Sequence, residues 1–462
     1  MAVALRVDMS AGRYVGGLFR EVTLIRRYLL SSVAGVAAVL AAGTASAQTE
    51  IQWWHAMGGN LGEAVNALAD GFNKSQTAYK VTAVFKGSYT ETLTAAVAAF
   101  RAKQGPHIVQ VFEVGTANMM AAKGAVYPVY QLMADTKEAF DPKAYIGPVY
   151  GYYSTTDGQL LSMPFNSSTP VFYWNKEMFS KAGLDANTPP KTWAEVGEMG
   201  KKLVASGAKC GFTPQWQTWT MIENYGAYHD LPFATKANGF GGMDIELKFN
   251  DPARVKHIQR LADWGKDKVF VYGGREGKST ALFTAGECAM HIASSATASA
   301  IDKALGSDKF GIAMMPYDAD VKAKPQNSII GGATLWALTG KPKEDYVGVA
   351  KFMTYLASAP VQAKWHQETG YVPVTLAAAK ITEDAGFYKK NPGRDIAVQQ
   401  LTLNPATENS KGLRIGNFVQ IRDVVDEELE NVWSGKKDAK AALDEAVKRG
   451  NELLRKFEAA NK

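Results

Sequence analysis

The spacing of hydrophobic positions changes regularly along the chain. Apolar runs of strand length occur at 51–54, 81–85 and 107–112. Between them, the segments 62–72 and 90–100 carry apolar residues at helical spacing on one face. Such strand and helix signals alternate to about residue 338, and this alternation predicts an α/β fold with parallel sheets covered by helices.

Residues just beyond the carboxyl ends of these strands are the first candidates for a binding site. They lie at 55–60, 86–89 and 113–116. In open α/β sheets, ligands bind beyond the carboxyl ends of the strands. We therefore expect these segments to lie close together.

The C-terminal part of the chain has a different pattern. From about residue 341 the strand signals stop, and the segments 424–433 and 439–458 carry apolar residues at three- and four-residue spacing. We expect this part to form a helical cover rather than a separate catalytic unit.

The N-terminal segment 1–47 has the features of a signal peptide. A basic pair at 26–27 precedes an apolar run at 28–42, and Ala-Ser-Ala at 45–47 is a cleavage signal. The apolar run is shorter than the roughly 20 residues that a membrane span needs. We expect export to the periplasm and a mature protein that begins at Gln48. The basic pair fits both the general secretory route and the twin-arginine route.

Composition and charge narrow the class of protein. With 46% hydrophobic and 21% charged residues, the chain has the composition of a globular protein. Removing 1–47 takes away five Lys or Arg and two Asp or Glu, so the net charge falls from +6 to +3. Such a small positive excess, without basic runs, predicts no nucleic-acid partner.

Two cysteines, Cys210 and Cys288, lie in the part that we expect to be exported. A disulfide between them would persist in an oxidising compartment. They could equally be two buried small residues, because the sequence does not give the distance between them. Both alternatives stay open at this point.

The sequence contains none of the common enzyme motifs, such as GxSxG, HExxH or CxxC. The segment 273–279, GGREGKS, is similar to a phosphate loop, but it is one residue short of the spacing that wraps a phosphate. We expect no catalytic residues, no metal ligands and no cofactor.

Aromatic and hydroxyl side chains at predicted strand ends are a stronger signal. Trp216 and Trp219 stand in a polar stretch, where they can offer flat apolar faces to a hydroxylated ligand or can belong to the core. The hydroxyl-rich segments 166–169 and 293–295 interrupt apolar runs. Ligand donors on strands that cross between lobes and local capping residues are both compatible with this pattern.

Several further segments together carry a resemblance to a known family. They are FKGSY at 85–89, QVFEVGT at 110–116, PFNSSTP at 164–170, MMPYD at 314–318, IIGGA at 329–333, TGY at 369–371 and GLRIGN at 412–417. Over essentially all of 48–462, the sequence resembles the periplasmic sn-glycerol-3-phosphate-binding proteins of Ugp-type ABC importers, within the wider maltose-binding class.

The resemblance implies an α/β, two-lobed periplasmic binding protein fold of type II, with an interlobe cleft and a helical C-terminal cover. One lobe is expected to comprise 48–163 and 296–340, and the other 166–293 and 342–462. The short crossing strands between them would act as hinges when the lobes close on a ligand.

The positions that line the cleft in this family fall here on Tyr89, Glu113, Ser168, Trp216, Trp219, Ser294, Gly332, Tyr371 and Arg422. The resemblance implies that Arg422 forks onto two phosphate oxygens. It also implies that Glu113 accepts hydrogen bonds from glycerol hydroxyls and that the two tryptophans cover the glycerol carbons. From its position alone, Arg422 would instead be a solvated arginine just before a helix that begins at Val424.

The implied function is that of a monomeric, non-enzymatic solute-binding protein. It would deliver sn-glycerol 3-phosphate, or a glycerophosphodiester such as glycerophosphocholine, to an inner-membrane ABC permease complex. Trp216 favours the compact monoester, although an indole face also attracts a choline cation. An oligosaccharide-binding protein of a related importer and a secreted phosphoesterase are the alternatives.

Overall fold

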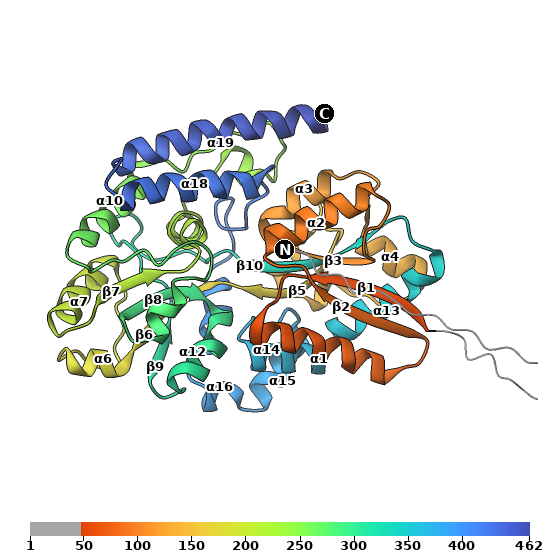
Figure 1. Cartoon of the computed structure of the whole chain (residues 1–462), viewed down its shortest axis with the longest axis horizontal. Helices are drawn as coiled ribbons and strands as arrows, with labels where there is room; N and C mark the ends of the chain where they lie inside the picture. Colours follow the sequence, from red (N-terminus) through yellow and green to blue (C-terminus); the bar gives the residue numbers. More distant parts are fainter. Residues whose placement is uncertain (1–47) are drawn as a thin grey trace, which may run out of the picture. The chain divides into compact units, whose positions relative to one another are not determined.

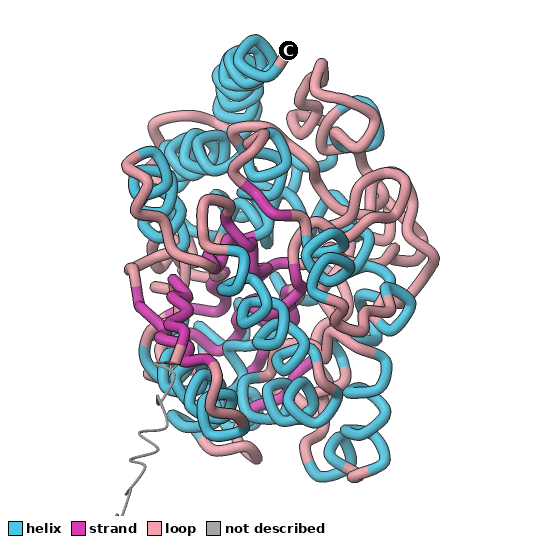
Figure 2. Tube along the Cα trace, turned by 90° about the vertical axis from the view of Figure 1, so that its right-hand side faces the viewer, coloured by secondary structure: helices cyan, strands magenta, loops and turns pink. Residues whose placement is uncertain are grey.

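The structure, a computed structural model, describes residues 48–462. The expected signal peptide at 1–47 lies outside these residues. Two β-sheets with helices around them organise the described part (Figure 1). In Figure 2 helices, in cyan, surround the strands, in magenta. None of the helices described there has the length and apolar content to cross a membrane.

The first sheet has six strands in the order β2-β1-β3-β10-β4, and β5 also pairs with β10. They are β1 (Thr49–His55), β2 (Tyr79–Phe85), β3 (Ile108–Phe112), β4 (Val126–Tyr127), β5 (Met163–Ser168) and β10 (Gly331–Leu338). The strands expected at 51–54, 81–85 and 107–112 are confirmed. The sheet is mixed rather than parallel, because β10 runs antiparallel to β3, β4 and β5.

The second sheet has four strands in the order β7-β8-β6-β9. They are β6 (Pro170–Asn175), β7 (Cys210–Pro214), β8 (Cys288–Ser294) and β9 (Phe310–Ala313). β7 and β8 are parallel, whereas β6 is antiparallel to β8 and β9. The sequence placed 296–340 in the first lobe, but β9 belongs to the second sheet because it pairs with β6 along its whole length.

Helices pack on both sheets and complete their cores. α1 (Gly59–Ser75) packs against β2, and α2 (Tyr89–Arg101) packs against β3. α7 (Trp193–Ala205) packs against β7, and α13 (Lys343–Ala357) packs against β1 and β5. α13 lies within 342–462, so part of this segment packs on the first sheet and not, as expected, with the second.

The remaining short elements connect these layers. The α-helices are α3 (Thr116–Ala121), α4 (Val129–Thr136), α5 (Gly147–Tyr153), α6 (Lys176–Lys181), α8 (Asn224–Tyr228), α9 (Thr235–Asn238), α11 (Thr280–Thr284), α12 (Ala298–Leu305), α14 (Ala359–Thr369), α15 (Leu376–Asp384), α16 (Phe387–Lys390) and α17 (Ile396–Leu401). The tighter or wider turns are the 3-10 helices η1 (Glu113–Gly115), η2 (Pro142–Ala144) and η4 (Ser295–Thr297) and the π-helix η3 (Thr218–Glu223).

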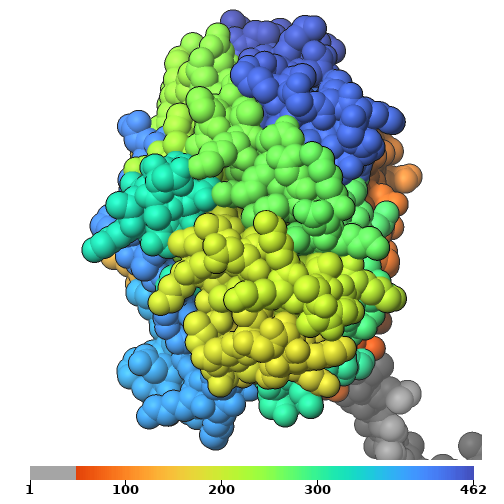
Figure 3. All heavy atoms as spheres, turned by 90° about the vertical axis from the view of Figure 1, so that its left-hand side faces the viewer, coloured from red at the N-terminus to blue at the C-terminus, as the bar shows by residue number. Residues whose placement is uncertain are grey.

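The expected helical cover is present at the C-terminus. α18 (Phe418–Trp433) and α19 (Ala439–Asn461) pack against each other and against α10 (Pro252–Lys266). In Figure 3 the residues of the C-terminal helices, in dark blue, lie at the top of the face shown, above green and yellow residues from the middle of the chain. α18 begins at Phe418 rather than at Val424, so it includes Arg422.

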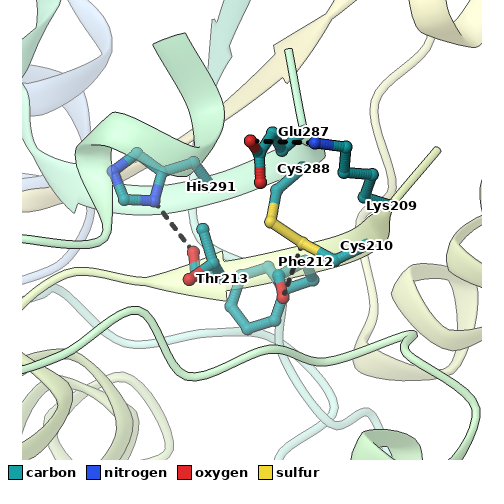
Figure 4. Close-up of a disulfide and its surroundings, with 7 residues drawn as sticks. All are labelled: Lys209, Cys210, Phe212, Thr213, Glu287, Cys288 and His291. Carbon is teal, nitrogen blue, oxygen red and sulfur yellow. Dashed lines mark hydrogen bonds and ion pairs between the residues drawn. A yellow bond between two sulfur atoms is a disulfide. The ribbon is translucent and has the colours of Figure 1, made fainter. Parts of the chain in front are cut away.

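The two cysteines form a disulfide between β7 and β8 (Figure 4). Cys210 and Cys288 are register partners in this parallel pair, and their Cα atoms are 4.5 Å apart. The short Cα separation follows from the pairing of the two strands. Strand pairing thus decides between the two alternatives that the sequence left open.

The chain passes from the first sheet to the second at a single residue, Thr169, between β5 and β6. Its Oγ1 lies 2.6 Å from Ser328 Oγ and 3.1 Å from the carbonyl oxygen of Ile329. The segment that leads into β10 therefore lies beside the crossing between β5 and β6.

Candidate functional site

A cavity of about 550 Å³ lies where loops of both sheets meet α18. Its lining includes residues from all three strand-end segments that the sequence singled out, 55–60, 86–89 and 113–116. The residues named from the family resemblance all line it: Tyr89, Glu113, Ser168, Trp216, Trp219, Ser294, Gly332, Tyr371 and Arg422. The structure therefore brings the whole set together around one cavity.

Arg422 lies at the wall of this cavity in a cluster of buried charges. Its Nε and Nη2 donate to the two carboxylate oxygens of Glu223, each at 2.7 Å. Its Nη2 also donates to Glu113 at 2.7 Å. The side chains of Arg422, Glu223 and Glu113 are only 8%, 1% and 6% exposed. The alternative that position alone favoured, a solvated arginine, is wrong, because α18 packs against both η1 and η3, which carry these carboxylates.

Burial and pairing act in opposite directions on the acid–base properties of this cluster. Burial raises the pKa of Glu113, Arg422 opposes this shift, and the charge of Glu223 adds to it. Burial alone would lower the pKa of Arg422, but Glu223 and Glu113 together raise it above its ordinary value. Arg422 is therefore a permanent cation. Within residues 48–462 its Nη1 has no hydrogen-bond partner and can donate to a ligand.

Glu223 is the residue of this cluster that sequence reasoning missed. It lies in η3, four residues after Trp219, and follows the buried residues Met221 and Ile222. A carboxylate inside an apolar run is costly to bury without a cation. The carboxylate inside an apolar run was visible in the sequence, but the sequence did not show which cation would pair with it.

Two tyrosines supply neutral donors to the cavity. Asn166 Nδ2 donates to the hydroxyl of Tyr89 at 2.9 Å, and Gln110 orients Asn166 through a 2.8 Å hydrogen bond. The Tyr89 ring stacks on Phe112 with centroids 5.2 Å apart. Burial raises the pKa of both Tyr89 and Tyr371. Both hydroxyls therefore keep their protons at neutral pH and can donate to an acceptor.

The position of Tyr89 is fixed by the start of α2. Ser88 and Glu91 form a capping box, in which the Ser88 hydroxyl accepts from the Glu91 amide and the Glu91 carboxylate accepts from the Ser88 amide. Tyr89 is the first residue of the helix. Because the capping box fixes the first turn, it also fixes the origin of this side chain.

The two tryptophans have different environments. Trp219 is 4% exposed, and its Nε1 donates to the carbonyl of Ile330 at 3.4 Å. It is therefore a core residue whose ring closes one wall of the cavity. Trp216 is partly exposed and adopts a left-handed backbone conformation with φ +47°. Its amide donates to the carbonyl of Glu276 at 2.8 Å.

The small residues of the cavity lie at the crossing between the sheets. Ser168 is the register partner of Gly331, and Ser294 is the register partner of Pro170. The Ser294 hydroxyl accepts from the Ala296 amide at 3.2 Å, so it also caps η4. Gly332 has φ +98°, and a Cβ there would lie 1.9 Å from the carbonyl oxygen of Asn166. The backbones of β5 and β10 can approach this closely only with glycine at 332.

The segment 273–279 does not have the context of a phosphate loop. It follows an isolated bridge between Phe212 and Phe270 rather than a strand. Two of its residues, Glu276 and Gly277, nevertheless line the cavity, and the sequence did not select them. The described residues also hold no group of three or more His, Cys, Asp and Glu side chains that could bind a metal ion.

Comparison with known proteins gives close relatives. Residues 67–395 match the family model described as bacterial extracellular solute-binding protein. The sn-glycerol-3-phosphate-binding periplasmic protein UgpB of Yersinia pseudotuberculosis is 52% identical over 90% of this chain and 95% of its own. UgpB of Pectobacterium atrosepticum is 51% identical over 94% of this chain and 97% of its own.

Solved structures share the fold at low sequence identity. UgpB from Mycobacterium tuberculosis, in complex with glycerophosphocholine, has a TM-score of 0.73 at 20% identity and covers 88% of this chain and 99% of its own. The GacH receptor of Streptomyces glaucescens has a TM-score of 0.74 at 17% identity, over 89% of this chain and 99% of its own. These likenesses confirm the expected fold, that of the maltose-binding-like periplasmic binding proteins. From the matched family model and the extent of identity to its relatives, the chain belongs to the bacterial extracellular solute-binding proteins.

Proposed function

We propose that this chain binds sn-glycerol 3-phosphate or a glycerophosphodiester and delivers it to an ABC importer. The observation that carries the proposal is the position of Arg422. Its guanidinium is buried at the wall of the cavity, is held there by two carboxylates, and keeps one nitrogen free of protein partners within residues 48–462. A guanidinium is the side chain best suited to bind phosphate oxygens.

Other groups of the cavity fit the rest of such a ligand. The hydroxyls of Tyr89 and Tyr371 can donate to phosphate oxygens that Arg422 does not reach. Glu113, which already accepts from Arg422, can accept from the hydroxyls of a glycerol unit. Trp216 offers an apolar face to the glycerol carbons. A ligand that carries both a phosphate and vicinal hydroxyls uses all of these groups.

Membership of the family settles the general role. The chain is a periplasmic solute-binding protein and not an enzyme, as the sequence led us to expect. Its close relatives from enterobacteria are named as sn-glycerol-3-phosphate-binding proteins, and this name supports the proposed ligand. A secreted phosphoesterase is not supported by these relatives.

The proposal includes the way in which ligand is held. The two sheets define two lobes, and the crossing at Thr169 acts as one hinge between them. The wall of the cavity combines residues near the first sheet, such as Glu113, with residues near the second, such as Ser294. Closure of the lobes would bring these groups together around one ligand molecule, and the binding unit is a monomer.

An oligosaccharide is the competing ligand, since several fold neighbours bind sugars, such as maltose bound to T. maritima MalE3. That likeness is 16% in identity and shows the fold alone. Calorimetric titration of the mature protein with glycerol 3-phosphate, glycerophosphocholine and maltose separates the two hypotheses. We expect heat of binding from the phosphate esters and none from maltose. Binding of maltose without binding of either ester would overturn the proposal.

A further inference from the structure

One side of the cavity carries a carboxylate that the proposed function leaves unused. Glu276 lines the cavity beside Trp216, whose amide donates to the Glu276 carbonyl. Within residues 48–462, its carboxylate takes part in no hydrogen bond and no ion pair. The side chain is half-buried, and burial raises its pKa. A carboxylate in this state can be stabilised by a cation that enters the cavity.

The charges around this carboxylate do not neutralise it. The positive charge of Lys278 stabilises the Glu276 carboxylate, but Lys278 is exposed to solvent. The negative charges of Glu91 and Asp423 destabilise it. Deeper in the cavity, the charge of Arg422 is already shared between Glu113 and Glu223. Carboxylates therefore outnumber cations along the wall of the cavity.

This excess of negative charge distinguishes between classes of phosphate ester. A monoester carries close to two negative charges at pH 7, because its second pKa is about 6. The phosphate of a diester carries only one negative charge, and the positive charge of a choline or ethanolamine head group cancels it. Electrostatic complementarity therefore favours a zwitterionic diester, which places its phosphate at Arg422 and a cation near Glu276.

We propose that Glu276 and Trp216 form a subsite for the cationic head group of a glycerophosphodiester, of the choline or ethanolamine type. The indole offers a face to the cation, and the carboxylate offers the opposite charge beside it. This inference rests on the proposed function. It extends the proposed site from the phosphate to the head-group alcohol that is esterified to that phosphate.

A groove that adjoins the cavity provides a matched control. Asn60, Leu61 and Ser299 belong both to the cavity and to an adjoining groove that includes Glu63 and Asp302. Asp302 is paired there with Arg394 at 3.0 Å, and Glu63 is exposed to solvent. Neither carboxylate has the combination of partial burial and missing partner that Glu276 shows. Glu63→Gln therefore makes the same change of charge in the adjoining groove, outside the lining of the cavity.

The test is calorimetric titration of the mature protein at pH 7 with glycerophosphocholine, glycerophosphoethanolamine and glycerol 3-phosphate. Glu276→Gln should weaken the binding of both diesters about tenfold, because it removes the charge that pairs with the head group and leaves the Trp216 indole in place. The same change should strengthen the binding of glycerol 3-phosphate, because it removes a repelling charge. Glu63→Gln should leave the affinity for all three ligands as in the wild type.

Each outcome decides one question. If Glu276→Gln weakens the binding of the diesters and of the monoester equally, or weakens the binding of neither, the subsite is overturned. A loss of diester binding in Glu63→Gln alone places the head group in the adjoining groove and also overturns the subsite. Wild-type protein that binds glycerol 3-phosphate but no diester refutes the subsite and leaves the proposed function intact. Wild-type protein that binds none of the three refutes the proposed function itself.

Discussion

Arg422 and Glu223 form a two-point ion pair in which both carboxylate oxygens accept from the guanidinium at 2.7 Å. The Nε and Nη2 atoms of Arg422 both donate to Glu223, and Nη2 also donates to Glu113. The pair therefore fixes the plane of the guanidinium and leaves Nη1 for an incoming ligand. It links α18 to η3, which are 199 residues apart at this contact.

Replacement of Arg422 should strongly weaken ligand binding. Arg422→Ala should weaken the binding of glycerol 3-phosphate by roughly 2–5 kcal/mol, because it removes one partner of a buried charge pair. It should also lower the free energy of unfolding by about 3 kcal/mol, since Glu113 and Glu223 are left buried without a cation. Arg422→Lys should bind poorly as well, because an ammonium cannot keep the planar two-point contact with Glu223 and also offer a separate nitrogen to the ligand.

Arg449 offers a matched control for this experiment. It also contacts two carboxylates, Glu427 and Glu428, but on α19 and with a side chain that is 33% exposed. Arg449→Ala should retain wild-type affinity and lose less than about 1 kcal/mol of stability. Titration calorimetry and urea denaturation measure the two quantities separately. Wild-type affinity in Arg422→Ala would contradict a phosphate site at this position.

The two tryptophans should separate binding from stability. Trp216→Ala should weaken ligand binding by roughly 1–3 kcal/mol through lost apolar contact, with little loss of stability. Trp219→Ala should lower the free energy of unfolding by about 3–5 kcal/mol, because it empties a buried ring position. Ligand should also change the indole fluorescence of the wild type. Unchanged affinity in Trp216→Ala would show that this indole does not contact the ligand.

Gly332 should tolerate no side chain. Gly332→Ala would place a Cβ against the carbonyl oxygen of Asn166 and would require φ +98° in a residue other than glycine. We expect a loss of stability of about 3 kcal/mol or more, from steric clash added to backbone strain.

Gly340 separates these two effects, because it also has a positive φ of +87°, but a Cβ at this position would have no neighbouring atom within 4 Å. Gly340→Ala should cost only about 1 kcal/mol, the strain alone. Thermal and urea unfolding of the two variants measure the difference. Equal losses in both would show that β5 and β10 can move apart at no cost.

Asp426 should make stability depend on pH in the acidic range. Burial raises its pKa to about 6, although Thr218 donates to it at 2.6 Å. A carboxyl whose pKa is higher in the folded state contributes stability that is complete below its unfolded pKa of about 4 and is lost as the pH rises through 6.

Asp426→Asn removes this titration and keeps an oxygen for Thr218. The variant should be more stable than the wild type at pH 7 by roughly 1–2 kcal/mol, and this difference should disappear near pH 4. Urea denaturation at several pH values measures it. A difference that is constant with pH would mean that Asp426 does not titrate in this range.

The disulfide should contribute to stability through the loop that it closes. Cys210 and Cys288 are 78 residues apart in the sequence. Replacement of both by serine should lower the free energy of unfolding by roughly 2–5 kcal/mol. The variant in oxidising buffer and the wild type with reductant should agree. A wild type whose stability does not respond to complete reduction would contradict this expectation.

The sequence by itself determined the elements and much of the site. Its hydrophobic periods located β1, β2, β3, α1 and α2, because each period depends on residues within one element. The same strand assignments also located the strand-end loops that line the cavity. The family resemblance then supplied individual residues such as Tyr89 and Gly332, all of which line one cavity.

Only the tertiary structure decided how distant segments meet. It placed β9 beside β6, made the first sheet mixed through β10, and joined Cys210 to Cys288. Local periodicity gives the face of a strand but not its neighbour or direction, since pairing depends on the path of the chain between strands. For the same reason, the sequence did not show that Arg422 pairs with Glu223 and Glu113. The burial of Arg422 depends on η1 and η3 meeting α18, which no local pattern specifies.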